Sequence, residues 1–111
     1  STTSHYREGP LASESTLLEC AEVLESAVIG KPDPERTEVV KAFVVLKPQY
    51  QASKELDSKL QAYVRSRLSK HAYPKEIEFV ESLPKTSSGK IQRNLLKQQE
   101  VAKMQTLQAA I

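Results

Sequence analysis

The residues best suited to chemistry stand in one short segment that ends in glycine and lysine. Residues 83–93 read Leu-Pro-Lys-Thr-Ser-Ser-Gly-Lys-Ile-Gln-Arg. The small and hydroxylated residues ahead of Lys90 let the backbone bend and approach a ligand closely. The ammonium group of Lys90 sits on a long side chain, which suits a movable positive charge beside a phosphate or carboxylate oxygen. Gly-Lys pairs are also common in surface loops, so the segment alone leaves an ordinary solvated loop as the alternative.

The remaining composition argues against several other kinds of site. The 111 residues carry 16 basic and 14 acidic side chains, and this near balance argues against a dedicated nucleic-acid-binding protein. Basic residues gather at 65–75 and 85–97, where either a solvated surface or a site for a phosphorylated ligand is open. The two histidines, His5 and His71, stand without clustered cysteines, so we expect no metal site. No apolar stretch is long enough to span a bilayer, and no secretory signal opens the chain.

The single cysteine points to a reducing environment. With Cys20 alone, no internal disulfide can form. Cys20 lies in an apolar pattern of helical spacing, so a buried small side chain is favoured over a nucleophile.

The hydrophobic pattern predicts the elements that must position residues 83–93. Their predicted order is helix, strand, strand, helix, strand, helix, at residues 11–21, 27–30, 39–46, 53–69, 76–80 and 94–104. The nearly continuous apolar run 39–46 suits a central strand covered on both faces. Ser53 is expected to cap the helix after it, and the two prolines within 31–35 predict a turn.

These elements predict an α+β fold, a small sheet of roughly three strands with helices packed on it. We expect a loop at residues 1–10, a globular core at 11–100 and a frayed tail at 101–111.

Four segments, in order, resemble motifs of one enzyme superfamily. Residues 83–93 are similar to the Pro-Lys-Thr-x-Ser-Gly-Lys-Ile-x-Arg motif of the adenylate-forming enzymes, which include acyl-CoA synthetases and luciferases. Residues 6–10 resemble the Gly-Tyr-Arg-Ile-Gly-Pro loop that precedes a helix carrying a glutamate, here Glu14. Residues 28–46 resemble a strand-loop-strand with Pro-Asp-Pro-x-Arg-Gly-Glu, and 73–80 resemble Tyr-Pro-Arg-Lys-Ile-Glu-Phe-Val. The chain is therefore identified as similar to the C-terminal domain of medium-chain acyl-CoA synthetases.

The resemblance implies an acid-thiol ligase that works in two steps. A medium-chain or aromatic carboxylic acid attacks the α-phosphate of ATP bound with Mg²⁺, and CoA thiol then displaces AMP. The domain would be a mobile lid that rotates between the two steps. ATP and the acid would be held by a large N-terminal domain that the chain lacks. The isolated domain is therefore expected to bind no cofactor alone and to be inactive.

The resemblance also assigns site residues. Lys90 matches the lysine that bridges carboxylate and phosphate during adenylation. Arg7 matches a position tied to the adenylation site. The positions that match CoA contacts are Ser4, His5, Tyr6, Arg36 and Arg65. The two arginines would hold nucleotide phosphates, although an exposed helix arginine without a ligand is an equal alternative for Arg65. A lysine acetyltransferase acting on Lys90 would silence it by removing its charge.

Some residues depart from the family pattern. His5 replaces a glycine, Glu8 stands where an apolar residue is usual, and Thr37 replaces another glycine. The departures leave Lys90 intact and bear instead on thioester formation, because an imidazole at residue 5 would crowd the pantetheine arm. They support the alternative of a non-catalytic descendant that regulates or binds partners.

We expect an intracellular location, either bacterial cytoplasm or mitochondrial matrix.

Overall fold

Six elements follow one another in the predicted order and give the predicted α+β class. The computed structural model describes residues 10–32, 38–68 and 73–110. The elements are α1 (Pro10–Leu18), β1 (Val23–Pro32), β2 (Glu38–Leu46), α2 (Lys54–Arg67), β3 (Glu76–Phe79) and α3 (Arg93–Ala110). The apolar periodicities therefore identified the type and order of each element correctly.

The strands form one three-stranded sheet in the order β1-β2-β3. β1 and β2 are antiparallel, with Val28 opposite Ala42, whereas β2 and β3 are parallel, with Ala42 beside Ile77. β2 is the central strand, and its residues 42–45 are buried. This confirms the prediction that the apolar run 39–46 is covered on both faces.

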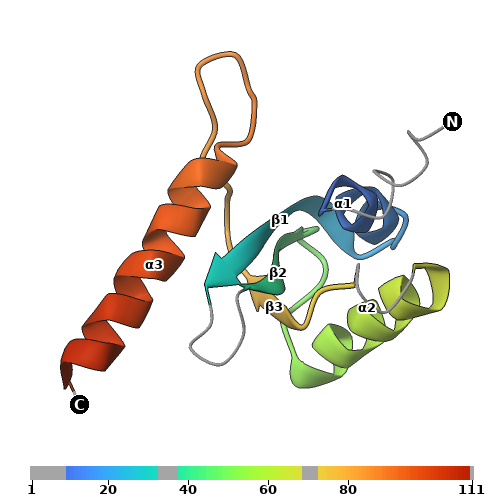
Figure 1. Cartoon of the computed structure of the whole chain (residues 1–111). Coiled ribbons are helices and arrows are strands. Elements are labelled where there is room, and N and C mark those ends of the chain that lie inside the picture. The colour runs from blue at the N-terminus through green and yellow to red at the C-terminus, as the bar shows by residue number, and fades with distance from the viewer. Residues whose placement is uncertain (1–9, 33–37, 69–72, 111) are drawn as a thin grey trace, which may run out of the picture.

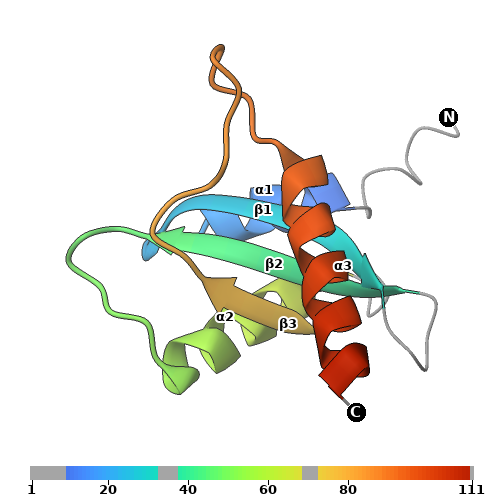
Figure 2. The same cartoon turned by 90° about the vertical axis from the view of Figure 1, so that its left-hand side faces the viewer.

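The helices cover the two faces of the sheet unequally. α1 and α2 lie on one face and α3 lies across the other (Figures 1 and 2). The core on the side of α1 and α2 consists of Leu17, Val23, Val28, Ala42, Val44, Leu60 and Val64. The core on the side of α3 consists of Ala27, Ile29, Phe43, Val45, Leu83 and Leu96. Successive residues of β1 and β2 alternate between the two cores, because neighbouring strand side chains point to opposite faces.

Local signals fixed the ends of α2. The Ser53 hydroxyl accepts a hydrogen bond from the Leu56 N–H at 3.0 Å, so the predicted N-cap is confirmed. The helix ends at Arg67, close to the predicted end at Ser69, and Leu68 is its C-cap.

Three predicted boundaries are wrong. β1 runs from Val23 to Pro32 and includes residues predicted as a turn. Pro32 is tolerated because it is the last residue of an edge strand. α1 ends at Leu18, so Cys20 lies in the following turn and not in a helix. The Cys20 side chain is half-buried and not fully buried as expected, and this burial raises the pKa of its thiol.

The third wrong boundary is the C-terminal end of α3. The helix continues to Ala110, past the predicted end at Met104 and through the stretch predicted as a frayed tail. Alanine and glutamine dominate its last turns, and both have high helix propensity. Along the described parts of the chain, no helix has the length and apolarity needed to cross a bilayer.

Candidate functional site

The segment that carries Lys90 is a narrow hairpin loop that projects beyond the sheet (Figure 1). Lys85 and Ile91 form an antiparallel bridge between its two legs. Below that bridge, the Gln92 N–H donates to the Pro84 carbonyl at 2.8 Å. The legs are therefore bound to each other, and the loop is an ordered hairpin.

The tip of the hairpin is organised by Thr86. The Thr86 N–H donates to the Lys90 carbonyl at 2.8 Å, and the Lys90 N–H donates to the Thr86 hydroxyl at 3.1 Å. Gly89 makes the turn with φ of 90°, a conformation that glycine adopts without the strain a side chain would bring. The backbone of Lys90 is thus held at both its N–H and its C=O.

The side chain of Lys90 is left available. Lys90 is exposed, and within the described residues its ammonium has no hydrogen-bond or ion-pair partner. The side chain borders an open hollow of about 580 Å³. That hollow is lined by Thr86, Lys90, Ile91, Gln92, Arg93, Asn94 and Leu95. A fixed backbone with an unpaired cation at an open hollow suits an anionic ligand that arrives from outside.

The base of the hairpin is tied to the body by Arg93 and Glu14. The Arg93 Nε donates to Glu14 Oε2 at 2.6 Å, and its Nη2 pairs with Oε1 of the same carboxylate. The Glu14 side chain is only 8% exposed, and its Oε2 also accepts the Val28 N–H at 2.8 Å. The hydrogen bonds to Glu14 raise the pKa of Arg93. This bidentate pair joins the start of α3 to both α1 and β1.

The sequence patterns did not predict this pair, although one signal was present. Glu14 lies three residues before Leu17 in α1, so it shares the face of the fully buried Leu17. A carboxylate on the apolar face of a helix requires a partner. That partner, Arg93, is distant in sequence and had been noted only as part of the motif.

The other leg of the hairpin has a weaker tie. The Lys85 ammonium pairs with the carboxylate of Glu25 in β1. The two side chains are 37% and 32% exposed, so solvent screens this pair more than the one at Glu14. Both legs therefore contact the body through ion pairs whose cations are similarly exposed, but only the pair at Glu14 has a buried carboxylate.

A buried charge network fixes α3 on the sheet. The Lys41 ammonium, 7% exposed, lies 2.9 Å from Glu100 of α3 and 2.8 Å from Glu78 of β3. Lys103 adds an ion pair to Glu100 at 3.0 Å. Burial opposes ionisation of Glu100, but the hydrogen bonds from Lys41 and Lys103 outweigh it and lower its pKa. The patterns missed this network too, and its signal was a lysine inside an otherwise apolar central strand.

Arg65 lies far from Lys90. It is exposed on α2, on the opposite face of the sheet from α3, and the two regions are well separated in both views (Figures 1 and 2). Its guanidinium lies over the Tyr73 ring at 5.3 Å from the centroid, and the Lys75 ammonium lies over the same ring at 5.1 Å. The structure therefore places Lys90 and Arg65 in separate parts of the domain, one on the projecting hairpin and the other on α2. The others, Ser4, His5, Tyr6, Arg7 and Arg36, lie outside the described residues.

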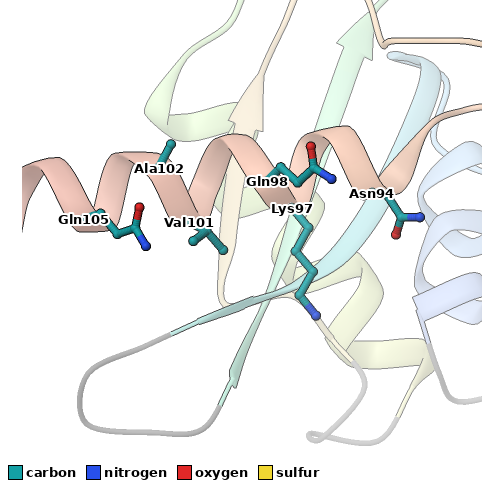
Figure 3. A pocket seen from close by; sticks show the side chains of 6 residues that line it. All are labelled: Asn94, Lys97, Gln98, Val101, Ala102 and Gln105. Carbon is teal, nitrogen blue, oxygen red and sulfur yellow. The ribbon is translucent and has the colours of Figure 1, made fainter.

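A second hollow runs along α3 away from the hairpin. Figure 3 shows its lining residues, Asn94, Lys97, Gln98, Val101, Ala102 and Gln105. They all come from one helix, so the hollow is an open surface between turns and brings no separate elements together. In the part of the chain described here, no group of three His, Cys, Asp or Glu side chains is arranged to hold a metal ion.

Comparison with known proteins identifies the relatives of this chain. Residues 12–90 match the family described as AMP-binding enzyme C-terminal domain. The chain is 46% identical over 100 residues to a mitochondrial acyl-coenzyme A synthetase of Mus musculus, in a match that covers 88% of the chain and 17% of that protein. It is also 46% identical over 99 residues to the acetyl-coenzyme A synthetase of Bacillus subtilis, covering 89% of the chain and 17% of that protein.

Solved structures agree with these sequence relationships. The acyl-CoA synthetase of Brucella canis superposes with a TM-score of 0.83 at 54% identity, over 86% of this chain and 18% of that one. A benzoate CoA ligase from Burkholderia xenovorans superposes with a TM-score of 0.76 at 43% identity, over 79% of this chain and 18% of that one. The chain thus spans less than a fifth of the length of these relatives.

Proposed function

The chain belongs to the AMP-binding enzyme C-terminal domain family, and from that premise we propose that it is the lid of an ATP-dependent acyl-CoA synthetase. The full reaction joins a carboxylic acid and CoA, with ATP converted to AMP and pyrophosphate. The observation that carries the proposal is Lys90, whose backbone is held in an ordered hairpin while its ammonium stays unpaired within the described residues.

In the first step Lys90 would act on the developing negative charge. The acid's carboxylate oxygen attacks the α-phosphorus of ATP, the bond to the bridging oxygen breaks, and pyrophosphate leaves. An ammonium between carboxylate and phosphate brings these two anions together and stabilises the charge in the transition state. Because Lys90 is a cation, it suits the phosphate oxygens and not Mg²⁺. The metal ion would be held with ATP and the acid by the N-terminal domain of the full-length enzyme, with Arg7 near the same site.

In the second step the opposite face would meet CoA. Arg65 and Lys75 both lie over the Tyr73 ring, so two cations gather on the side of the sheet away from Lys90. Guanidinium and ammonium groups suit the phosphates of the CoA nucleotide. The resemblance adds Arg36 to the phosphate contacts, and the Ser4, His5 and Tyr6 segment to the backbone contacts with CoA. Because the hairpin that carries Lys90 and the helix that carries Arg65 are well separated, rotation of the domain would bring each to one active site in turn.

The proposal is tested by the activity of the full-length protein. Medium-chain and aromatic acids would be supplied with ATP, Mg²⁺ and CoA, and pyrophosphate release and acyl-CoA would be measured. We expect both products with at least one acid. A non-catalytic descendant of this domain, the alternative raised by the His5, Glu8 and Thr37 departures, would release no pyrophosphate with any acid.

A lesser proposal concerns modification of Lys90. Lys90 is exposed on a projecting loop, so a lysine acetyltransferase would reach it, and acetylation would remove the charge that adenylation needs. Mass spectrometry of the full-length enzyme after incubation with an acetyltransferase and acetyl-CoA should detect acetyl-Lys90, and an unmodified Lys90 would refute this proposal.

We also propose an intracellular location, because the matched relatives include a protein named mitochondrial and a bacterial protein.

A further inference from the structure

The geometry points to Glu14 and Arg93 as positioning residues that aim Lys90, an inference that rests on the proposed role of Lys90 in adenylation. Neither side chain is proposed to touch the substrate. They would act by fixing the orientation of the hairpin relative to the body of the domain.

A short chain connection links Arg93 to Lys90. Arg93 begins α3 and lies three residues after Lys90. Three residues span at most about 10 Å when fully extended. The connection is tighter than this limit because Ile91 is bridged to Lys85 and Gln92 is bonded to Pro84. A movement of Arg93 is therefore passed on to Lys90.

Arg93 is itself held rigidly. Two donors of its guanidinium meet two oxygens of Glu14, which fixes the plane of the group as well as its distance. Glu14 is 8% exposed and is held in turn by the Val28 N–H. The pair thus ties three elements, α1, β1 and α3, at the point where the hairpin leaves the body.

Two other ion pairs, Lys85–Glu25 and Lys41–Glu100, hold the hairpin and α3. The Lys85–Glu25 pair on the opposite leg is about one-third exposed on each side, so it constrains the hairpin less firmly. The Lys41–Glu100 pair holds α3 seven residues further along, about two helical turns from Arg93. It fixes the body of α3 on the sheet without contacting the hairpin. Of the two ties at the hairpin, only Glu14–Arg93 has a buried carboxylate, since Glu14 is 8% exposed and Glu25 is 32% exposed, while the two cations are similarly exposed at 39% and 37%. Only Glu14–Arg93 is also a two-pronged contact.

Positioning of this kind has a characteristic effect on rate. A displacement of about 1 Å in a catalytic group costs roughly a hundredfold in rate, even when the altered residue is remote. Loss of the pair should therefore slow adenylation, which uses Lys90, and spare thioester formation, which in the proposed scheme uses the opposite face.

The test is Glu14→Gln in the full-length enzyme. The substitution keeps the size of the side chain but removes its charge and turns an amide N–H₂ toward the donors of Arg93 or Val28. We expect adenylation, measured as pyrophosphate release, to fall about tenfold to a hundredfold. Thioester formation from supplied acyl-adenylate should stay within about twofold of the parent enzyme.

Glu22→Gln is the matched control. Glu22 is another glutamate close to α1, with a side chain 11% exposed and an ion pair to Lys59. It contacts neither the hairpin nor α3 in the described structure. Its substitution should leave both half-reactions within about twofold, since it removes a similar interaction with no connection to Lys90.

A double variant separates positioning from simple structural support. If Glu14 acts through Lys90, adding Glu14→Gln to Lys90→Ala should cause no further loss of adenylation, because the group being positioned is already gone. Arg93→Lys keeps a positive charge but loses the two-pronged contact, so it should lower adenylation less than Glu14→Gln and provides a second variant should Glu14→Gln misfold.

Four outcomes would overturn one proposal or the other. Equal loss of both half-reactions in Glu14→Gln and Arg93→Lys, or a further loss in the double variant, would reduce the pair to structural support. Full adenylation in both single variants, while Lys90→Ala is crippled, would refute the positioning role alone. Normal adenylation in Lys90→Ala would instead refute the proposed function.

Discussion

The two lysines that matter most in this domain use their charges in opposite ways. Lys41 is buried and lies within 3 Å of two carboxylates, so its charge holds α3 to the sheet. Lys90 is exposed, and in the described structure its charge has no partner, although its neighbours Lys85 and Arg93 are both paired. The difference shows how a fold keeps one cation available. Ion pairs on either side hold the hairpin, and the residue between them, Lys90, is the one proposed to meet a ligand.

The largest effect on stability should come from breaking the network at Lys41. We expect Lys41→Met to lower the free energy of unfolding by about 3 kcal/mol, because removing one partner strands a buried carboxylate. The loss stays at the low end of the usual range because Lys103 still pairs with Glu100. Urea denaturation would measure it. Lys90→Met should change stability by less than about 0.5 kcal/mol. A similar loss of stability at both lysines would contradict the distinction between a structural Lys41 and an available Lys90.

Acid should weaken the ion pairs of Lys41, with a smaller expected effect on stability than the loss of Lys41 itself. Burial opposes ionisation of Glu78 and Glu100, but hydrogen bonds from Lys41 lower the pKa of both below the ordinary value of 4.5. Their stabilisation is therefore complete above about pH 4.5 and is lost as the pH falls through the lowered pKa values. Urea denaturation at several pH values should show this loss in the parent domain and a smaller one in Glu78→Gln. Equal acid sensitivity in the two proteins would contradict the network's role.

The smallest effect should come from the tip of the hairpin. Gly89→Ala forces a side chain into positive φ, where an added Cβ would meet nothing within 4 Å, so the cost is backbone strain of about 1 kcal/mol. We expect the free energy of unfolding to fall by no more than this amount and pyrophosphate release to be slower, because the turn sets the position of Lys90. Release at the parent rate would show that the shape of the tip does not matter.

The elements and their order could be predicted because each leaves a local periodic signal. The alternation of β1 and β2 between two cores, the stripe of α2 and the cap at Ser53 all depend on residues close together in sequence. A loop carrying Lys90 was predictable for a similar reason, since its small residues, its glycine and Lys90 form one continuous motif. A flexible loop was expected, however, and its closure into an ordered hairpin was not predicted.

The ties that hold the hairpin and α3 could not be predicted in this way. Glu14 and Arg93 are 79 residues apart, and Lys41 and Glu100 are 59 residues apart. Each residue shows only that it is a charge on an apolar face, and the choice of partner depends on how the helices dock. The predicted ends of β1 and α3 were wrong for a related reason. Pairing with β2 extends β1 beyond its apolar pattern, and helix-favouring residues extend α3 beyond its own.

Separate measurement of the two half-reactions in Lys90→Ala of the full-length enzyme shows whether Lys90 serves adenylation alone. Loss of one well-placed charge should slow pyrophosphate release a few hundredfold, or about 3–4 kcal/mol, and leave thioester formation from supplied acyl-adenylate unchanged. Lys54→Ala, at an exposed lysine that begins α2, should alter neither step. Equal loss in both half-reactions, or adenylation at the parent rate, would contradict the account.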